Sequence, residues 1–177
     1  VLTDMVEADD DPNLPPLWIL VLDYDTVFEQ DAVPRLLTYA AASDYDFVAA
    51  VQMKRRVAEP LVTMVDEKGD RISEVKRGEL LLNNIVPANT AHFGLSLLRA
   101  SALKKMERPW FKGVPNKDGK WAEGRTDPDI WFWQQAKKAG LKAGICTRVT
   151  VGHIECWIKW PDKGMGQLLQ HPGEFWD

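Results

Sequence analysis

Two aspartates stand two residues apart at the end of an apolar run near the start of the sequence. Residues 17–22 are all apolar and lead into Asp23-Tyr24-Asp25. Alternate residues of an extended chain project to the same side, so Asp23 and Asp25 can converge on one hard divalent cation. Mg²⁺ and Mn²⁺ both favour such oxygen ligands. The structural alternative is that aspartate simply ends the strand as a turn former or caps the next helix.

Two more groups of acidic or imidazole side chains follow later in the chain. Asp127-Pro128-Asp129 opens a helical pattern, with Asp127 at the cap, Pro128 at the first helical position and Asp129 in the first turn. His153 follows Val151-Gly152 at the end of an apolar stretch. Each has a purely structural interpretation: a helix cap, a partner of the helix dipole, or an ordinary surface histidine.

The segments that carry these residues alternate between strand and helix patterns. Residues 17–22 have the length and composition of a strand covered on both faces, which is typical of a parallel sheet. A helix capped by Asp31 and a strand at 46–51 complete a strand, helix, strand unit. Further along, the sequence predicts a hairpin over 61–75, a strand at 91–98 with a short helix, a mobile loop at 112–125, a helix closing near Gly140, and a strand at 144–152. We therefore expect an α/β domain with a mostly parallel central sheet, helices on both faces and an inserted β-hairpin.

Length and composition fit one globular domain. The 177 residues carry a net charge of -4, which gives no electrostatic reason to expect nucleic acid as a partner, and no apolar stretch is long enough to span a membrane. The two cysteines, Cys146 and Cys156, lack metal-site spacing and indicate reduced thiols and a cytoplasmic protein. We divide the chain into an acidic flexible lead-in at 1–16, a domain at 17–157 and a Trp-containing C-terminal tail at 158–177.

Taken in order, the three groups resemble one enzyme family, the family 2 glycosyltransferases. The nucleotide-diphospho-sugar transferase fold of that family (glycosyltransferase A-type) carries an Asp-x-Asp, then an acidic pair opening a helix, then a late Gly-His. The resemblance runs from about Trp18 to Ile154. It rests on these matches: residues 22–28 (Leu-Asp-Tyr-Asp-Thr-Val-Phe), 94–99, 126–132 (Thr-Asp-Pro-Asp-Ile-Trp-Phe), 139–141 (Ala-Gly-Leu) and 151–154 (Val-Gly-His-Ile).

The resemblance implies a role for each site residue. Asp25 would bind the Mn²⁺ or Mg²⁺ that bridges the donor diphosphate, and Asp23 would contact the ribose or support the metal. His153 would be a further metal ligand. Asp129, which aligns with the second acid of the family's pair, would deprotonate the acceptor hydroxyl in an inverting transfer. Asp127 is offset by one place and is the reserve candidate for the base.

The sequence departs from the family in two respects. Family members have a nucleotide-binding half before the Asp-x-Asp, whereas here that motif begins at position 23. The expected explanations are a fragment of a longer protein, which we favour, a partner chain that supplies the missing half, or a degenerate protein without activity. Pro128 also replaces the first acid of the family's pair, which leaves open whether Asp127 or Asp129 is the base.

Two functions of different kinds follow. The first is a metal-dependent glycosyltransferase, or its catalytic portion, which uses a nucleotide-sugar donor and a hydroxyl acceptor on a glycan, lipid or protein. The alternative is a non-catalytic glycan- or protein-binding module on the same fold, acting through its Trp-rich C-terminal part. A metal-dependent phosphohydrolase or nucleotidyltransferase would also use Asp-x-Asp, but the sequence shows no second carboxylate cluster and no phosphate-cradling glycine loop.

Overall fold

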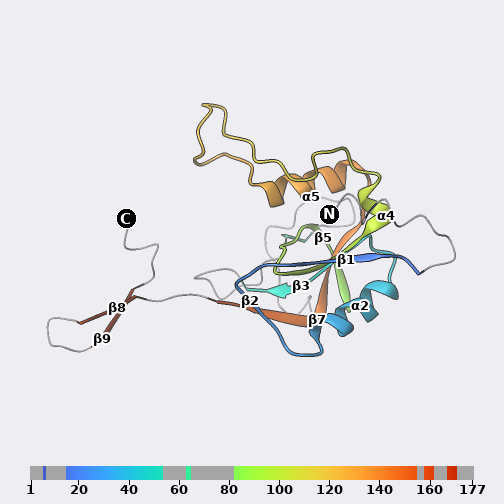
Figure 1. Ribbon diagram of the computed structural model, residues 1–177, viewed down its shortest axis with the longest axis horizontal. Coiled ribbons are helices and arrows are strands. Elements are labelled where there is room, and N and C mark those ends of the chain that lie inside the picture. The colour runs from blue at the N-terminus through green and yellow to red at the C-terminus, as the bar shows by residue number, and fades with distance from the viewer. Residues whose placement is uncertain are drawn as a thin grey trace.

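The computed structural model describes Val6 and residues 15–53, 63–64, 82–154, 158–161 and 167–170 (Figure 1). Most of the lead-in at 1–16, the second cysteine Cys156 and most of the predicted hairpin at 61–75 lie outside these residues. Within the predicted hairpin, the described part is the strand β4 (Thr63–Met64), which pairs antiparallel with a strand at Ile85–Thr90.

A seven-stranded mixed sheet forms the centre of the protein. Its strands lie in the order β1-β6-β3-β7-β5-β4, and β2 pairs with the end of β7. The strands besides β4 are β1 (Trp18–Leu22), β2 (Thr26–Val27), β3 (Phe47–Gln52), β5 (Ile85–Thr90), β6 (Leu95–Arg99) and β7 (Ala143–His153).

The strand directions correct the prediction of a mostly parallel sheet. Only β3 and β7 pair in parallel within the described sheet; β6 pairs antiparallel with both β1 and β3, and β5, β4 and β2 also join antiparallel. The predicted strand, helix, strand unit exists, but β6 lies between its two strands. An apolar run carries no information on the direction of a strand's neighbours, so the sequence pattern could not reveal this insertion. The prediction that residues 17–22 form a strand covered on both faces is also wrong: β1 is the end strand of the described sheet, and Leu20 and Leu22 are 44% and 46% exposed.

Helices cover both faces of the sheet, as predicted. Successive residues of β3 point to opposite faces, so Phe47 belongs to one core cluster and Val48 to another. Helix α2 (Ala32–Ala41) packs on the Val48 face through Leu36 and Ala40. Helices α4 (Ala100–Leu103) and α5 (Pro128–Lys138) cover the Phe47 face. Figure 1 shows α5 above the strands and α2 below them.

The end of α5 follows the predicted stop signal. Gly140 adopts a φ of 71°, a left-handed conformation that residues with a Cβ rarely accept. Its N–H donates to the carbonyl of Lys137, and the N–H of Leu141 donates to that of Ala136. These bonds close the helix just before β7 begins.

The C-terminal part of the chain contributes a second, two-stranded sheet. Strands β8 (Ile158–Pro161) and β9 (Gln167–Gln170) pair antiparallel, and Figure 1 shows them apart from the main sheet. Among the described residues, no helix has the length and apolar character needed to cross a bilayer.

Candidate active site

Three strands end at the same edge of the sheet, and each end carries a polar side chain. Because β6 is antiparallel to both β1 and β3, and β7 is parallel to β3, the strands β1, β3 and β7 run in one direction. Asp23 directly follows β1, Gln52 is the last residue of β3, and His153 is the last residue of β7. Sheets of this kind place ligand sites beyond such carboxyl ends.

The structure brings Asp25 and His153 together. Nε2 of His153 lies 2.9 Å from Oδ2 of Asp25, and both side chains are 15% exposed. Backbone bonds hold them there: the N–H of Ile154 donates to the Asp25 carbonyl at 2.8 Å, and the N–H of Asp23 reaches the Gly94 carbonyl at 3.4 Å. The turn at 23–25 is thus hydrogen-bonded to the end of β7 and to the residue before β6. It brings Asp25 next to His153, which lies 128 positions later in the sequence.

A buried hydroxyl lies beside this pair. Thr26 is directly opposite His153 in the β2–β7 ladder, so their side chains share one face of the sheet. Oγ1 of Thr26 is buried and has no hydrogen-bond partner among the described residues. Buried polar atoms are normally satisfied, and an exception calls for a reason such as an ion or ligand. Thr26 directly follows the second aspartate of the motif, but no sequence pattern predicted it as a site residue.

The geometry of the pair suits a cation. Two ligand atoms at neighbouring positions of an octahedral Mg²⁺ site, each at about 2.1 Å from the metal, lie about 3.0 Å apart. The 2.9 Å between the Asp25 oxygen and the His153 nitrogen is close to this spacing, and it is equally the ordinary distance of a hydrogen bond or ion pair, which a cation would have to replace. Protein side chains alone do not complete such a site, because no three His, Cys, Asp or Glu residues of the described chain gather closely enough to hold a metal.

The buried side chain of His92 makes two backbone hydrogen bonds close to this edge of the sheet. His92 accepts a hydrogen bond at Nδ1 from the Gly94 N–H (2.9 Å), so its Nε2 carries the hydrogen donated to the Ala50 carbonyl (2.8 Å). Gly94 is required here, because a Cβ would come within 2.9 Å of both His92 Nδ1 and Gln52 Nε2. The pKa of His92 is lowered to about 4, mainly by burial and to a smaller extent by the nearby His153, while the hydrogen bond to the Ala50 carbonyl opposes the shift.

The neutral state of His92 makes stability depend on pH. Its pKa is 6.5 in the unfolded chain and about 4 in the fold, so the unfolded state gains protons first as the pH falls. We expect the free energy of unfolding to drop by about 3 kcal/mol between about pH 7.5 and pH 4 from this group. Urea titrations across this range should show a shallower pH dependence for His92→Asn, which does not titrate. Equal slopes for the two proteins would contradict the assignment.

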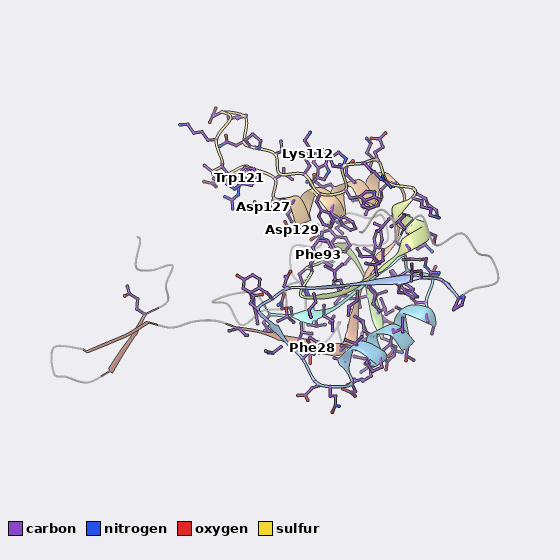
Figure 2. All side chains as sticks on the ribbon, in the orientation of Figure 1. Phe28, Phe93, Lys112, Trp121, Asp127 and Asp129 are labelled. Atoms are coloured by element: carbon purple, nitrogen blue, oxygen red, sulfur yellow. The ribbon has the colours of Figure 1, made fainter. Side chains whose placement is uncertain are left out.

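Asp127 and Asp129 lie at the start of α5 (Figure 2). Asp127 occupies the N-cap position, but its side chain does not cap the helix; Nε of Arg125 donates to its Oδ1 at 2.8 Å. Asp129 Oδ1 accepts from the N–H of Ile130 at 2.8 Å, and this carboxylate takes part in no ion pair within the described chain. The two carboxylates, of which the sequence made Asp129 the first candidate for the base and Asp127 the reserve, therefore differ in their partners.

An aromatic cluster connects the start of α5 to the edge of the sheet. Phe93, between His92 and Gly94, lies 5.3 Å from Phe132 and 5.2 Å from Trp133 between ring centroids. Phe132 is one helical turn after Asp129, so the same cluster that fixes the start of β6 also fixes the helix turn that carries Asp129. Figure 2 shows Phe93 on the sheet side of Asp127 and Asp129.

A cavity of about 340 Å³ lies elsewhere, at the edge where β3 and β7 begin. It is lined by Tyr45, Trp133, Lys137 and Ala143, among others, and includes the ion pair between Asp44 and Lys142. It contains none of Asp23, Asp25, Asp127, Asp129 or His153. Its size does not make it the reactive centre, because the carboxylates and the imidazole lie at the opposite edge.

Comparison with known proteins supports the fold alone. The crystal structure of A197 from STIV is similar to this chain, with a TM-score of 0.54 and 15% sequence identity over 96% of this chain and 72% of that chain. No family model and no curated protein matches the sequence. This similarity therefore supports an α/β fold and carries no information on the function of this chain.

Proposed function

We propose that this chain is a metal-dependent glycosyltransferase, or the catalytic portion of one, that moves a sugar from a nucleotide-diphosphate donor to an acceptor hydroxyl. The observation that carries the proposal is the 2.9 Å approach of His153 Nε2 to Asp25 Oδ2 at the carboxyl edge of the sheet. These two residues are the ones that the family resemblance designates as metal ligands, and they are distant in the sequence. A chance resemblance of short motifs gives no reason for them to meet.

The cation of such a site, Mn²⁺ or Mg²⁺, would be held by Asp25 and His153, with Asp23 supporting the turn and the Thr26 hydroxyl beside it. When bound, the cation neutralises the negative charge that grows on the departing diphosphate. No third His, Cys, Asp or Glu of the described chain joins these two, so the proposal requires the donor to supply further ligands.

Asp129 is the proposed general base. Its carboxylate accepts the proton of the acceptor hydroxyl as that oxygen forms a bond to the anomeric carbon, and the bond from that carbon to the diphosphate breaks. The nucleoside diphosphate leaves with the electron pair. Attack opposite the leaving group inverts the anomeric configuration. Asp127 is the weaker candidate because Arg125 already occupies one of its oxygens at 2.8 Å.

Calorimetric titration of Mn²⁺ with a panel of nucleoside diphosphates tests the proposal. We expect Asp25→Asn and His153→Ala each to weaken metal-dependent nucleotide binding by more than about 100-fold, since even residues that only orient a metal ligand contribute 10–100-fold. Addition of EDTA should have the same effect on the wild type. Asp31→Asn, an exposed aspartate at the start of α2, is the matched control and should bind like the wild type.

The alternative function makes the opposite prediction. A non-catalytic glycan- or protein-binding module would bind neither Mn²⁺ nor nucleotide, and the two substitutions would leave its binding partners unaffected. Wild-type protein that fails to bind any metal and nucleotide pair would therefore remove the support for glycosyl transfer by this chain.

A further inference from the structure

Residues 112–126 form an arm that projects from the body of the protein between α4 and α5 (Figure 1). Val114 and Thr126 exchange two backbone hydrogen bonds, at 2.9 and 2.8 Å, which close the base of the arm. Near its tip, Oδ1 of Asn116 accepts from the N–H groups of Asp118 and Lys120. The arm is thus a hydrogen-bonded hairpin-like loop that leads directly into Asp127.

The arm carries an exposed indole. Trp121 is 57% exposed, one of the most exposed large apolar residues of the described chain. Its ring lies over Gly113: an ideal Cβ built there would come within 2.3 Å of the Trp121 ring. The guanidinium of Arg125 is 5.8 Å from the centre of the same ring. Gly113 and Arg125 therefore position a ring that still presents much of its surface to solvent.

Polar groups continue from this ring to the proposed base. Arg125 binds Asp127 at 2.8 Å, and Asp129 stands two residues later, in the first turn of α5. At the base of the arm, Nζ of Lys112 lies 5.4 Å from the ring centre of Trp131, whose indole N–H donates to the Pro109 carbonyl at 3.2 Å. Figure 2 shows Trp121 and Asp127 along the stretch that runs from the arm into the helix.

This combination suits a saccharide. A pyranose has an apolar face of C–H groups that packs against an aromatic ring, and hydroxyls that both donate and accept hydrogen bonds. Arg125 supplies donors and Asp127 supplies acceptors beside the ring. Arg125 and Asp127 compensate each other's charge beside the ring, and the arm also carries the positive charges of Lys117 and Lys120.

We infer that the arm binds the acceptor, and that the acceptor is a saccharide stacked on Trp121 with its hydroxyls bound by Arg125 and Asp127. The role of this saccharide as acceptor rests on the proposed function, whereas binding of a saccharide to the arm does not. The arm would direct a hydroxyl of the bound sugar towards Asp129 at the start of α5.

A glycan array with hexose, N-acetylhexosamine, deoxyhexose and uronic acid termini tests the inference on the full chain, and titration with the best-bound oligosaccharide then gives affinities. We expect Trp121→Ala to weaken saccharide binding about tenfold or more, as loss of an aromatic stacking partner does, and Trp121→Phe to retain most of it. Gly113→Ala should also weaken binding, since the added methyl displaces the ring without removing it. Leu37→Ala, an exposed apolar residue on α2, is the control.

Titration of the same variants with Mn²⁺ and nucleoside diphosphate separates this inference from the proposed function. Saccharide binding that depends on Trp121 supports the inference whether or not metal and nucleotide bind. Absence of binding to every glycan on the array, or equal binding by the wild type and Trp121→Ala, overturns it. Trp121-dependent binding of a single-stranded oligonucleotide in place of glycans overturns it as well.

Discussion

Replacement of Asp129 by asparagine is expected to lower kcat for sugar transfer by about 10²- to 10⁴-fold, the usual contribution of a positioned general base. Asparagine is isosteric, and its Oδ1 can still accept the hydrogen bond from the Ile130 N–H that Asp129 makes at 2.8 Å. The helix start should therefore keep its shape, and metal and nucleotide binding should stay near the wild-type values. Release of nucleoside diphosphate in the presence of acceptor measures kcat directly.

Asp127→Asn is the matched control for this experiment. It stands two residues away in the same helix start and removes the same charge, but its partner is Arg125. We expect it to lower kcat by less than about tenfold, because its carboxylate is committed to the ion pair, and to act mainly on the KM of the acceptor that Arg125 and Asp127 are inferred to bind. If Asp127→Asn loses more activity than Asp129→Asn, the role of base passes to Asp127.

Phe132→Ala should produce the largest loss of stability, about 3–5 kcal/mol of the free energy of unfolding. Phe132 is fully buried, and its ring centroid lies 5.0–5.4 Å from those of Phe47, Phe93, Phe111 and Trp133. Truncation leaves a cavity where α5 meets the sheet, which the surrounding rings cannot fill without moving. Urea denaturation followed by circular dichroism measures the change, because far-UV signal reports the helices and strands together.

Two further variants show whether the loss comes from this cavity. Phe132→Leu retains much of the volume and should cost less than half as much, while Phe28→Ala, at a ring that is 38% exposed, should cost less than about 1 kcal/mol. Equal losses at Phe28 and Phe132 would mean that the aromatic cluster does not anchor α5. A loss of stability at Phe132 should also reduce transfer activity, since the same cluster holds the turn that carries Asp129.

Local chemistry in the sequence was sufficient to predict most of the elements near the site. The apolar run before Asp23 is β1, the Asp127-Pro128 signal opens α5, and the stretch before His153 is β7. Each prediction depended on a pattern within about ten residues: a buried strand composition, a proline at the first helical turn, or a glycine stop. β5 was missed because Pro87 interrupts its pattern, and two-residue β2 is too short to leave one.

The candidate site itself was only partly predictable. The family resemblance designated Asp25 and His153 as metal ligands, which stays a prediction; the structure shows that the two side chains lie 2.9 Å apart. The residues around them had no local signal. Thr26 matters because it faces His153 across a ladder, and His92 because its ring is buried behind the strand ends. In the sequence, one is an ordinary threonine after a turn and the other a histidine without context.

Patterns within single segments were enough to predict β1, α2, β3, α5 and β7, because strand and helix preferences arise from each segment's own residues. Only the tertiary structure decided that β6 lies between β1 and β3, that Asp25 meets His153, and that Arg125 engages Asp127 rather than Asp129. The reason is physical: strand order and long-range side-chain contacts depend on how separate segments pack together, and no single segment encodes its neighbour.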